Sequence, residues 1–294
     1  MDLVEYRSTS EIVQLVRTIV NEPQHRFAIE NAALLNVSNF VADGWRDSHL
    51  RFFSFGPYVF ITEENENQQT QIFVRPPPQG HDFDLLKNGI RQLLDKLKNS
   101  IAAHKKLLVD CELEVANEFA KVAREYGLRV DGKVEMCVFY MNQLQIEELS
   151  KQYIQLPDGY DFVELDCEAD TELIYETWSA KRSTTADAMK KKIEHLPSVG
   201  ARTSTGDLVA WEIASSSVGK LNHLYTLPAH RGKGIGLKTE LRMAQICAGK
   251  CVKVFKNVVV TNDAVVNGSS KHPFWTLWKR GEEPVKWAVF YFEM

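Results

Sequence analysis

Six consecutive residues near the start of a predicted helix have the composition of a phosphate-binding loop. They are Arg231-Gly232-Lys233-Gly234-Ile235-Gly236, and they follow a strand-like apolar run, Leu221 to Leu227, and a turn at Pro228. Glycines let backbone N–H groups approach a ligand closely, and a helix N-terminus adds partial positive charge. Arg231 and Lys233 add two cationic side chains. The segment therefore predicts a binding site for a polyanion that contains a pyrophosphate.

Two other phosphate-binding motifs do not match the chain. The glycines at 232, 234 and 236 lack the Gly-x-Gly-x-x-Gly spacing of a dinucleotide-binding fingerprint. A P-loop-like segment begins at Gly127, but Val134 stands where the Mg²⁺-binding Ser or Thr belongs. Because that segment follows a predicted helix (Glu114 to Tyr126) rather than a strand, we interpret it as a helix-ending turn.

Composition places the chain among ordinary intracellular globular proteins. It has 294 residues, of which 44% are hydrophobic and 25% charged, a length that suits two domains or one elaborated α/β unit. No apolar run approaches the roughly 18 residues that span a bilayer, and Met1 to Glu5 does not begin a signal peptide. The five scattered cysteines predict reduced thiols and no metal site. We therefore expect a protein that does not contact membranes.

Positive charge gathers around the glycine-rich loop. The segment 220–294 contains 12 Lys or Arg and 5 Asp or Glu, which makes it +7 and leaves −11 for the segment 1–219 of a chain whose net charge is −4. Such a field attracts a ligand that carries several phosphates. Nucleic acid is excluded as a partner because no zinc finger, homeodomain or aromatic RNA-binding signature accompanies the charge.

The elements expected from periodicity alternate between helix and strand along the whole chain. In the first half we expect helices at Thr9 to Val20, Phe83 to Asn99 and Glu112 to Tyr126, and strands at Ala32 to Val41, Phe52 to Thr62, Gln71 to Arg75, Leu107 to Val109 and Val134 to Met141. Leu156-Pro157-Asp158-Gly159 is a plausible domain boundary. In the second half we expect helices at Ala169 to Lys181, Met189 to Leu196 and Ile235 to Lys250, and strands at Phe162 to Leu165, Val199 to Thr203, Leu208 to Ala214, Leu221 to Leu227 and Val254 to Thr261. The C-terminal segment, Trp275 to Met294, is expected to form a pair of strands around Gly281 to Pro284.

The glycine-rich loop and the order of these elements resemble the GNAT superfamily of acyltransferases. The spacing Arg-x-x-Gly-x-Gly after a strand is similar to the pyrophosphate loop with which those enzymes bind acyl-coenzyme A. The resemblance implies an α/β fold with a mixed sheet, in which the strands before and after the loop and its helix splay apart and the pantetheine arm enters the gap. Leu221 to Leu227 and Val258 to Thr261 would be those two strands.

The second half resembles one GNAT family more closely, the glycine N-acyltransferases. The resemblance rests on Leu156-Pro157-x-Gly159, Trp178, Pro197-Ser198-Val199-Gly200, Gly206-x-x-x-x-Trp211, Gly219, Thr226-Leu227-Pro228-x-x-Arg231 and Trp275-x-x-Trp278, and more loosely on Asp43-Gly44-Trp45. It implies a tandem GNAT-like fold: a degenerate N-terminal domain (1–150) and an acyl-CoA-binding catalytic domain (151–294). The family is often mitochondrial, but since no targeting presequence is visible we expect the cytoplasm, with the mitochondrial matrix as the alternative.

The implied reaction is acyl transfer from acyl-CoA to the amine of glycine or another small amino compound, by direct attack on the thioester. A protein or polyamine N-acetyltransferase, and a non-catalytic acyl-CoA-binding protein, are the alternatives. In the glycine N-acyltransferase family a glutamate near the loop is thought to serve as general base. From Gly219 to His230 this chain has no Asp or Glu, and Lys220 and Ala229 occupy the aligned positions.

Two residues are candidates for the proton transfers. His223 shares a strand face with Tyr225 and could act as the general base, since an unperturbed His titrates near pH ~6.5; it could equally be a core histidine. Ser270 (or Ser269) stands where GNAT enzymes often carry the Tyr that protonates the departing thiolate, or it could simply start a turn.

Further residues are expected to bind the coenzyme, with no metal involved. The backbone of Leu224 to Thr226 would polarise the thioester carbonyl, and Asn262 would bond the pantetheine arm. The expected coenzyme-binding set is Leu224, Tyr225, Thr226, Arg231, Gly232, Lys233, Gly234, Ile235, Gly236 and Asn262.

Overall fold

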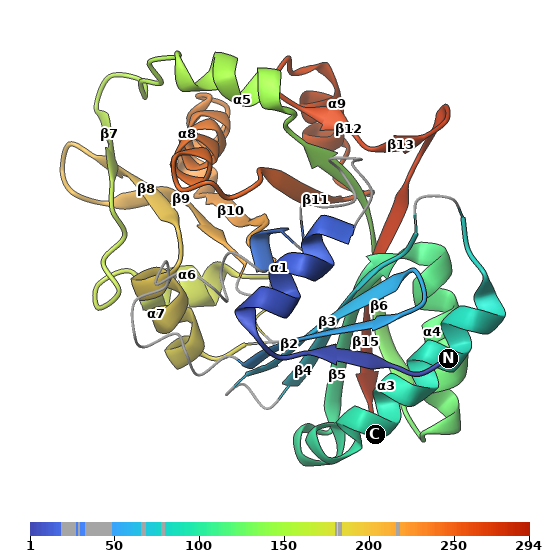
Figure 1. Cartoon of the computed structure of the whole chain (residues 1–294). Coiled ribbons are helices and arrows are strands. Elements are labelled where there is room, and N and C mark those ends of the chain that lie inside the picture. The colour runs from blue at the N-terminus through green and yellow to red at the C-terminus, as the bar shows by residue number, and fades with distance from the viewer. Residues whose placement is uncertain are drawn as a thin grey trace.

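The computed structural model describes residues 1–18, 28, 30–32, 49–65, 69–77, 80–179, 181, 184–215 and 218–294. One mixed sheet runs through both halves of the chain (Figure 1), in the strand order β1-β2-β3-β4-β5-β15-β6-β11-β10-β9-β8-β7. Its strands are β1 (Val4–Tyr6), β2 (His49–Phe55), β3 (Tyr58–Asn65), β4 (Gln69–Arg75), β5 (Lys106–Glu112), β6 (Arg129–Tyr140), β7 (Tyr160–Val163), β8 (Ser198–Thr203), β9 (Leu208–Ala214), β10 (Leu221–Thr226), β11 (Phe255–Val259), β15 (Lys286–Glu293) and, beside β6, β12 (Thr276–Leu277). The expected α/β fold with a mixed sheet is confirmed.

Helices cover the sheet in both halves. They are α1 (Thr9–Thr18), α3 (Phe83–His104), α4 (Leu113–Glu125), α5 (Gln143–Ser150), α6 (Thr171–Thr177), α7 (Ala186–His195), α8 (Ile235–Gly249) and α9 (Asp263–Lys271), with a short 3-10 helix, η3 (Pro228–His230), before the loop. Each long helix turns an apolar stripe to the sheet; in α3 the buried side chains include Leu86, Ile90, Leu93, Leu97 and Ile101. No helix in these ranges is long and apolar enough to cross a bilayer.

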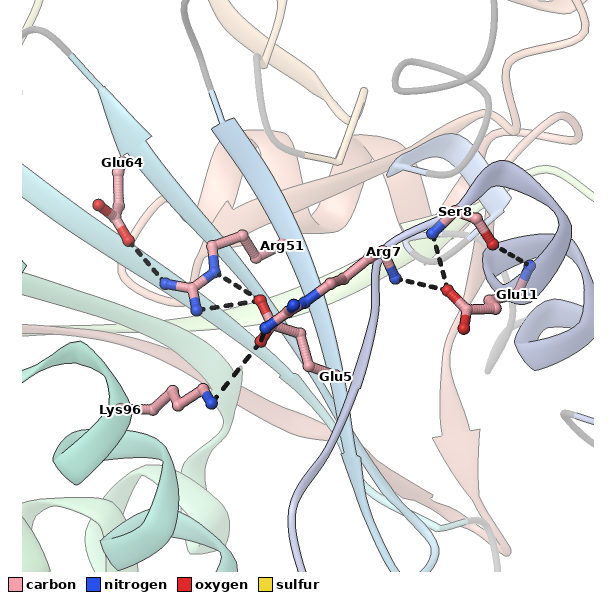
Figure 2. A network of polar contacts seen from close by, with 7 residues as sticks. All are labelled: Glu5, Arg7, Ser8, Glu11, Arg51, Glu64 and Lys96. Atoms are coloured by element: carbon pink, nitrogen blue, oxygen red, sulfur yellow. Dashed lines mark hydrogen bonds and ion pairs between the residues drawn. The ribbon is translucent and has the colours of Figure 1, made fainter.

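The N-terminal strand is held on the first half by a polar network (Figure 2). The Glu5 carboxylate of β1 accepts hydrogen bonds from Arg51 of β2 at 3.0 Å and from Arg7 at 2.9 Å. Arg51 also lies 3.3 Å from Glu64 of β3. Ser8 and Glu11 then begin α1: the Glu11 carboxylate accepts from the Ser8 N–H at 2.8 Å, and the Ser8 hydroxyl accepts from the Glu11 N–H at 3.3 Å. This reciprocal pair is a capping box, so the sequence itself sets the start of the helix.

The last strand of the chain inserts into the first half. β15 lies between β5 and β6 and is antiparallel to both, while β6 pairs on its other side with β11 of the second half. We expected the C-terminal segment to pair with itself. Only β13 (Lys279–Arg280) and β14 (Glu283–Pro284) do so, around Gly281, and the longer β15 bonds to strands far away in sequence. Most of β15 is buried, so this strand needs partners on both sides and helices over it, which a lone hairpin cannot supply.

Most other expected elements are present with shifted ends. The single strand expected at Phe52 to Thr62 is instead the antiparallel hairpin of β2 and β3, which turns at Gly56 and Pro57. The P-loop-like segment is a helix-ending turn: α4 ends at Glu125, and Gly127 has φ +76. α6 ends at Thr177, earlier than the expected Lys181. The expected strand Ala32 to Val41 and the motif Asp43-Gly44-Trp45 lie outside the described residues, except for Ala32, which is helical. The division at residue 150 stays a prediction; it falls at the end of α5.

Candidate functional site

A fork between two parallel strands opens in front of the glycine-rich loop. β10 and β11 pair in parallel at one register position, Leu221 with Lys256. Beyond it β10 continues along β9, and β11 continues along β6. The two strands therefore diverge and expose unpaired backbone edges to the gap, as expected from the sequence.

β10 carries a bulge just past the start of the fork. Asn222 pairs with Ile213 and Tyr225 pairs with Trp211, so His223 and Leu224 together face only Glu212 of β9. His223 has φ +55, a left-handed conformation that is uncommon for a residue other than glycine. The bulge re-aims the backbone N–H groups of this stretch and marks it as a site where strain is maintained by its surroundings.

The loop leaves the first N–H groups of α8 without a side-chain cap. Gly234 is the N-cap residue, with φ +76, and makes no side-chain cap hydrogen bond. The corresponding helix of the first half differs: the Asp82 carboxylate accepts from the Leu85 N–H at 2.9 Å at the start of α3. A carboxylate in that position fills the place of a bound anion and repels phosphate. α8, not α3, therefore has the features of an anion-binding N-terminus.

Two loop glycines leave room for a ligand, and the third brings α8 against the sheet. A Cβ added at Gly232 or Gly234 would meet no atom within 4 Å. A Cβ added at Gly236 would lie 2.9 Å from Oγ1 of Thr226, closer than real Cβ contacts. Gly236 is thus required for the close packing of α8 on the end of β10.

The cationic side chains of the loop have partners within the described chain. Nε of Arg231 donates to the backbone oxygen of Thr226 at 2.9 Å, and its guanidinium lies 5.3 Å from the ring centre of Tyr225. Nζ of Lys233 donates to the Tyr160 hydroxyl at 2.9 Å. Tyr160 of β7 was not predicted from the sequence, because no motif connects it with a loop so distant along the chain.

The ring of His223 lies in an aromatic cluster on the face of the sheet opposite α8. It stacks on Trp178 at 4.3 Å between centroids and meets the edge of Trp211 at 6.4 Å. Both ring nitrogens are buried, and neither has a hydrogen-bond partner among the residues described. Burial, and then the nearby charge of Lys192, lower the pKa of His223 to about 3. The imidazole is therefore neutral near pH 7, and its catalytic role stays a proposal.

The other predicted polar residues lie on and before α9. Ser270 is exposed in the last turn of α9, whereas Ser269 is buried. The Asn262 side chain accepts from the Val265 N–H at 3.4 Å and so caps this helix. Asn262 comes shortly after the C-terminal end of β11, the end at which the fork is open.

Lys220, which stands where the resembling family carries a carboxylate, is itself bound to a carboxylate. Its Nζ lies 2.5 Å from Oδ2 of Asp110 in β5, and the other oxygen of Asp110 accepts from the indole N–H of Trp287 in β15. All three side chains are buried. The pair joins the second half of the chain to the first.

A second buried charged cluster lies beneath α8. Nζ of Lys256 is 2.5 Å from Oε1 of Glu240, whose other oxygen accepts from the Trp275 indole at 3.0 Å. Burial, and then the negative charge of Glu240, raise the pKa of Glu212 well above its ordinary value. Glu212 and its neighbour Trp211 point to opposite faces of the sheet, because successive residues of a strand alternate. Since Trp211 contacts His223, the aromatic cluster around His223 lies on the face opposite the Lys256–Glu240 cluster.

A cavity lies between the halves on the face opposite α8. Its volume is about 20 Å³, roughly the room that one water molecule needs, and Phe73, Arg75, Val138, Tyr140, Asn257 and Trp287 are among its lining residues. Asn257 follows Lys256, the last residue of β11 that is paired with β10, so it stands at the point of the fork. Its amide oxygen is buried and has no hydrogen-bond partner within the described ranges.

Known proteins share this architecture. A Drosophila protein of known crystal structure superposes with a TM-score of 0.74, at 16% identity and over 98% of both chains. A tandem GNAT protein from the clavulanic acid biosynthesis pathway gives 0.55, at 12% identity, over 99% of this chain and 98% of that one. This chain has the tandem GNAT fold. A GCN5-related N-acetyltransferase from Sphaerobacter thermophilus superposes with a TM-score of 0.50, at 9% identity, over 99% of this chain and 95% of that one.

One sequence comparison falls on the site itself. The profile of the FR47-like protein family matches residues 198–267, which include β10, the loop, α8 and β11. No curated protein matches the chain significantly. The match and the shared GNAT fold together support a place in the GNAT superfamily, and the narrower resemblance to glycine N-acyltransferases stays a prediction.

Proposed function

We propose that this protein is an N-acyltransferase that moves an acyl group from acyl-CoA to the amine of glycine or another small amino compound. The observation that carries the proposal is the combination in one place of the β10–β11 fork, the bulge at His223 and Leu224, and an α8 N-terminus capped only by Gly234. Each of these three features suits a different group of a thioester coenzyme: the fork suits the pantetheine arm, the bulge the acyl carbonyl and the helix N-terminus the pyrophosphate. The GNAT fold supports the same assignment.

The coenzyme would bind across these three features. Its pyrophosphate would lie against the N–H groups of Gly232 to Gly236, where the helix dipole favours negative charge. The pantetheine arm would enter the fork and pair with the open edges of β10 and β11. The acyl carbonyl would then face the backbone N–H groups of Leu224 to Thr226, at and directly after the bulge, which would act as oxyanion donors.

The reaction is a direct displacement at the acyl carbon. The amine nitrogen attacks the carbonyl carbon, negative charge builds on the oxygen beside the bulge, the C–S bond breaks and the thiolate leaves. The proton lost by the amine would go to His223 or to solvent, and Ser270 or solvent would protonate the sulfur. A base with a pKa of about 3 is weak, so His223 would act mainly as a hydrogen-bond acceptor that orients the amine.

The acceptor would approach from the face of the sheet on which Asn257 lies. Asn257 offers a buried amide oxygen that lacks a hydrogen-bond donor in the described structure, and an amine can supply that donor. Because Asn257 stands at the point of the fork, an amine bonded to it would lie close to the acyl carbon.

A second candidate is an acyl-CoA-binding protein without catalysis. It is favoured by the lack of Asp and Glu between Gly219 and His230 and by the low basicity of His223. Backbone N–H groups can bind the coenzyme without an acidic residue in this segment and without a basic histidine.

A thiol-release assay distinguishes these functions. Acetyl-CoA and benzoyl-CoA are each supplied with and without glycine, and in parallel with a polyamine and a lysine peptide. Glycine-dependent release of CoA supports the proposal. Release only with the polyamine or the peptide would mean that the acceptor is a polyamine or a protein lysine and not glycine. No release, together with saturable CoA binding by calorimetry, supports the binding protein. In an active protein Arg231→Ala should raise the KM for acyl-CoA more than it lowers kcat.

A further inference from the structure

Tyr160 connects two side chains of the loop region through its hydroxyl group. The hydroxyl lies 2.9 Å from Nζ of Lys233 and 2.9 Å from Nδ1 of His230. Its ring meets the His230 ring edge-on at 5.7 Å, and the Lys233 ammonium lies 5.5 Å from its centre. One residue of β7 thus fixes the positions of two residues on either side of Arg231 and Gly232.

The proton positions follow from the chemistry of the three groups. A lysine ammonium only donates, so the phenol oxygen must accept from Lys233. The phenol hydrogen is then free to donate to Nδ1 of His230, and in the tautomer that accepts this bond the ring N–H is at Nε2. Tyr160 therefore selects the tautomer in which His230 donates from Nε2, and holds the ring beside the Lys233 cation. Two donor side chains held by one phenol oxygen suit a phosphate group.

The sheet order shows which phosphate this would be. The fork lies between β11 and β10, and β7 is the outer strand on the other side, beyond β9 and β8 (Figure 1). A coenzyme whose thioester lies in the fork and whose pyrophosphate lies on the loop can extend its remaining part past the loop, toward β7. That part is the ribose, which bears the 3′-phosphate of coenzyme A.

We propose that Tyr160 organises Lys233 and His230 into a subsite for the 3′-phosphate, and so makes the protein discriminate coenzyme A from dephospho-coenzyme A. This inference rests on the proposed binding of acyl-CoA. Tyr160 is a positioning residue, since its own hydroxyl is occupied by the two side chains that it orients.

Calorimetric titration with CoA and with dephospho-CoA tests the proposal. The wild-type protein should bind CoA more tightly than dephospho-CoA. Tyr160→Phe removes both hydrogen bonds and keeps the ring, so it should weaken CoA binding roughly threefold to tenfold and leave dephospho-CoA within about twofold. Lys233→Met should reduce the same preference. In turnover, Tyr160→Phe should raise the KM for acyl-CoA at unchanged kcat.

The control variant is Tyr153→Phe, because Tyr153 lies in the same half and is 88% exposed; it should change neither affinity. Equal binding of both ligands by the wild type, or an equal loss of both in Tyr160→Phe, would overturn the subsite while leaving acyl-CoA binding intact. If the wild type binds neither ligand, the proposed function itself is wrong, and the subsite with it.

Discussion

The ammonium group of Lys220 lies 2.5 Å from the carboxylate of Asp110, although the two residues are separated by 110 positions in the chain. Lys220 directly precedes β10, and Asp110 is in β5 of the first half. Trp287 of the inserted strand β15 donates to the same carboxylate. One buried contact therefore fixes the start of the strand that carries the bulge to both the first half and the last strand.

Removing one member of this pair should destabilise the whole chain. Lys220→Met leaves a carboxylate buried without its cation, a change that costs about 3–5 kcal/mol in comparable pairs. Urea denaturation measures the free energy of unfolding. Lys151→Met is the matched control, because Lys151 pairs with Glu148 at the surface, where the two side chains are 66% and 61% exposed. A loss no greater than that of the control would show that the buried pair stabilises the fold no more than a surface pair does.

Gly236→Ala should impair coenzyme binding through packing alone. The new Cβ would lie 2.9 Å from Oγ1 of Thr226, so the first turn of α8 must move away from β10. We expect the KM for acyl-CoA to rise about fivefold, which corresponds to about 1 kcal/mol. Gly249→Ala at the exposed end of the same helix, where nothing lies within 4 Å of an added Cβ, should leave the KM unchanged. Equal KM values for the two variants would contradict this role of Gly236.

The parts of the site that the sequence predicted are local in the chain. A strand, a turn at Pro228, three glycines and an amphipathic helix are consecutive, and each has its own conformational preference. The fork also followed, through the resemblance of that consecutive pattern to the GNAT superfamily. The bulge could not be predicted, because nothing in the residue types of His223 and Leu224 indicates that both lie opposite a single residue of β9.

The parts that could not be predicted join distant segments. The insertion of β15 between β5 and β6 depends on pairing between the C-terminus and strands of the first half, and an alternating apolar pattern fits any buried strand position. The contacts of Tyr160 and of Asp110 are likewise set by tertiary packing. Such pairs leave no spacing signal in a single sequence.

Glu212→Gln should stabilise the protein increasingly as the pH rises. Burial, and then the charge of Glu240, hold the pKa of Glu212 well above 4.5, so the folded protein keeps a proton that the unfolded chain releases. Stability is consequently lost as the pH rises above the unfolded value, by up to about 1.4 kcal/mol per pH unit. Gln cannot ionise and avoids this loss. Urea denaturation at pH 5 and pH 8 should show a gain over the wild type that is larger at pH 8; a gain independent of pH would disprove the raised pKa.

His223 should make the protein sensitive to acid in the opposite direction. Its pKa is about 3 in the folded protein against 6.5 for an unperturbed imidazole. Between those values the unfolded chain binds a proton that the folded protein does not. The stability contributed by the neutral ring is therefore complete above pH 6.5 and is lost as the pH falls toward 3.

The variant His223→Asn isolates this effect. Asn tolerates the left-handed backbone at this position, where φ is +55, and it has no proton to gain. Between pH 7 and pH 5 the wild type should lose about 2 kcal/mol more unfolding free energy than the variant. Lys192→Met should reduce the loss, since the Lys192 charge contributes to the lowered pKa. An identical loss in the wild type and His223→Asn would mean that the ring titrates normally, and would restore His223 as a general base with a pKa close to neutrality.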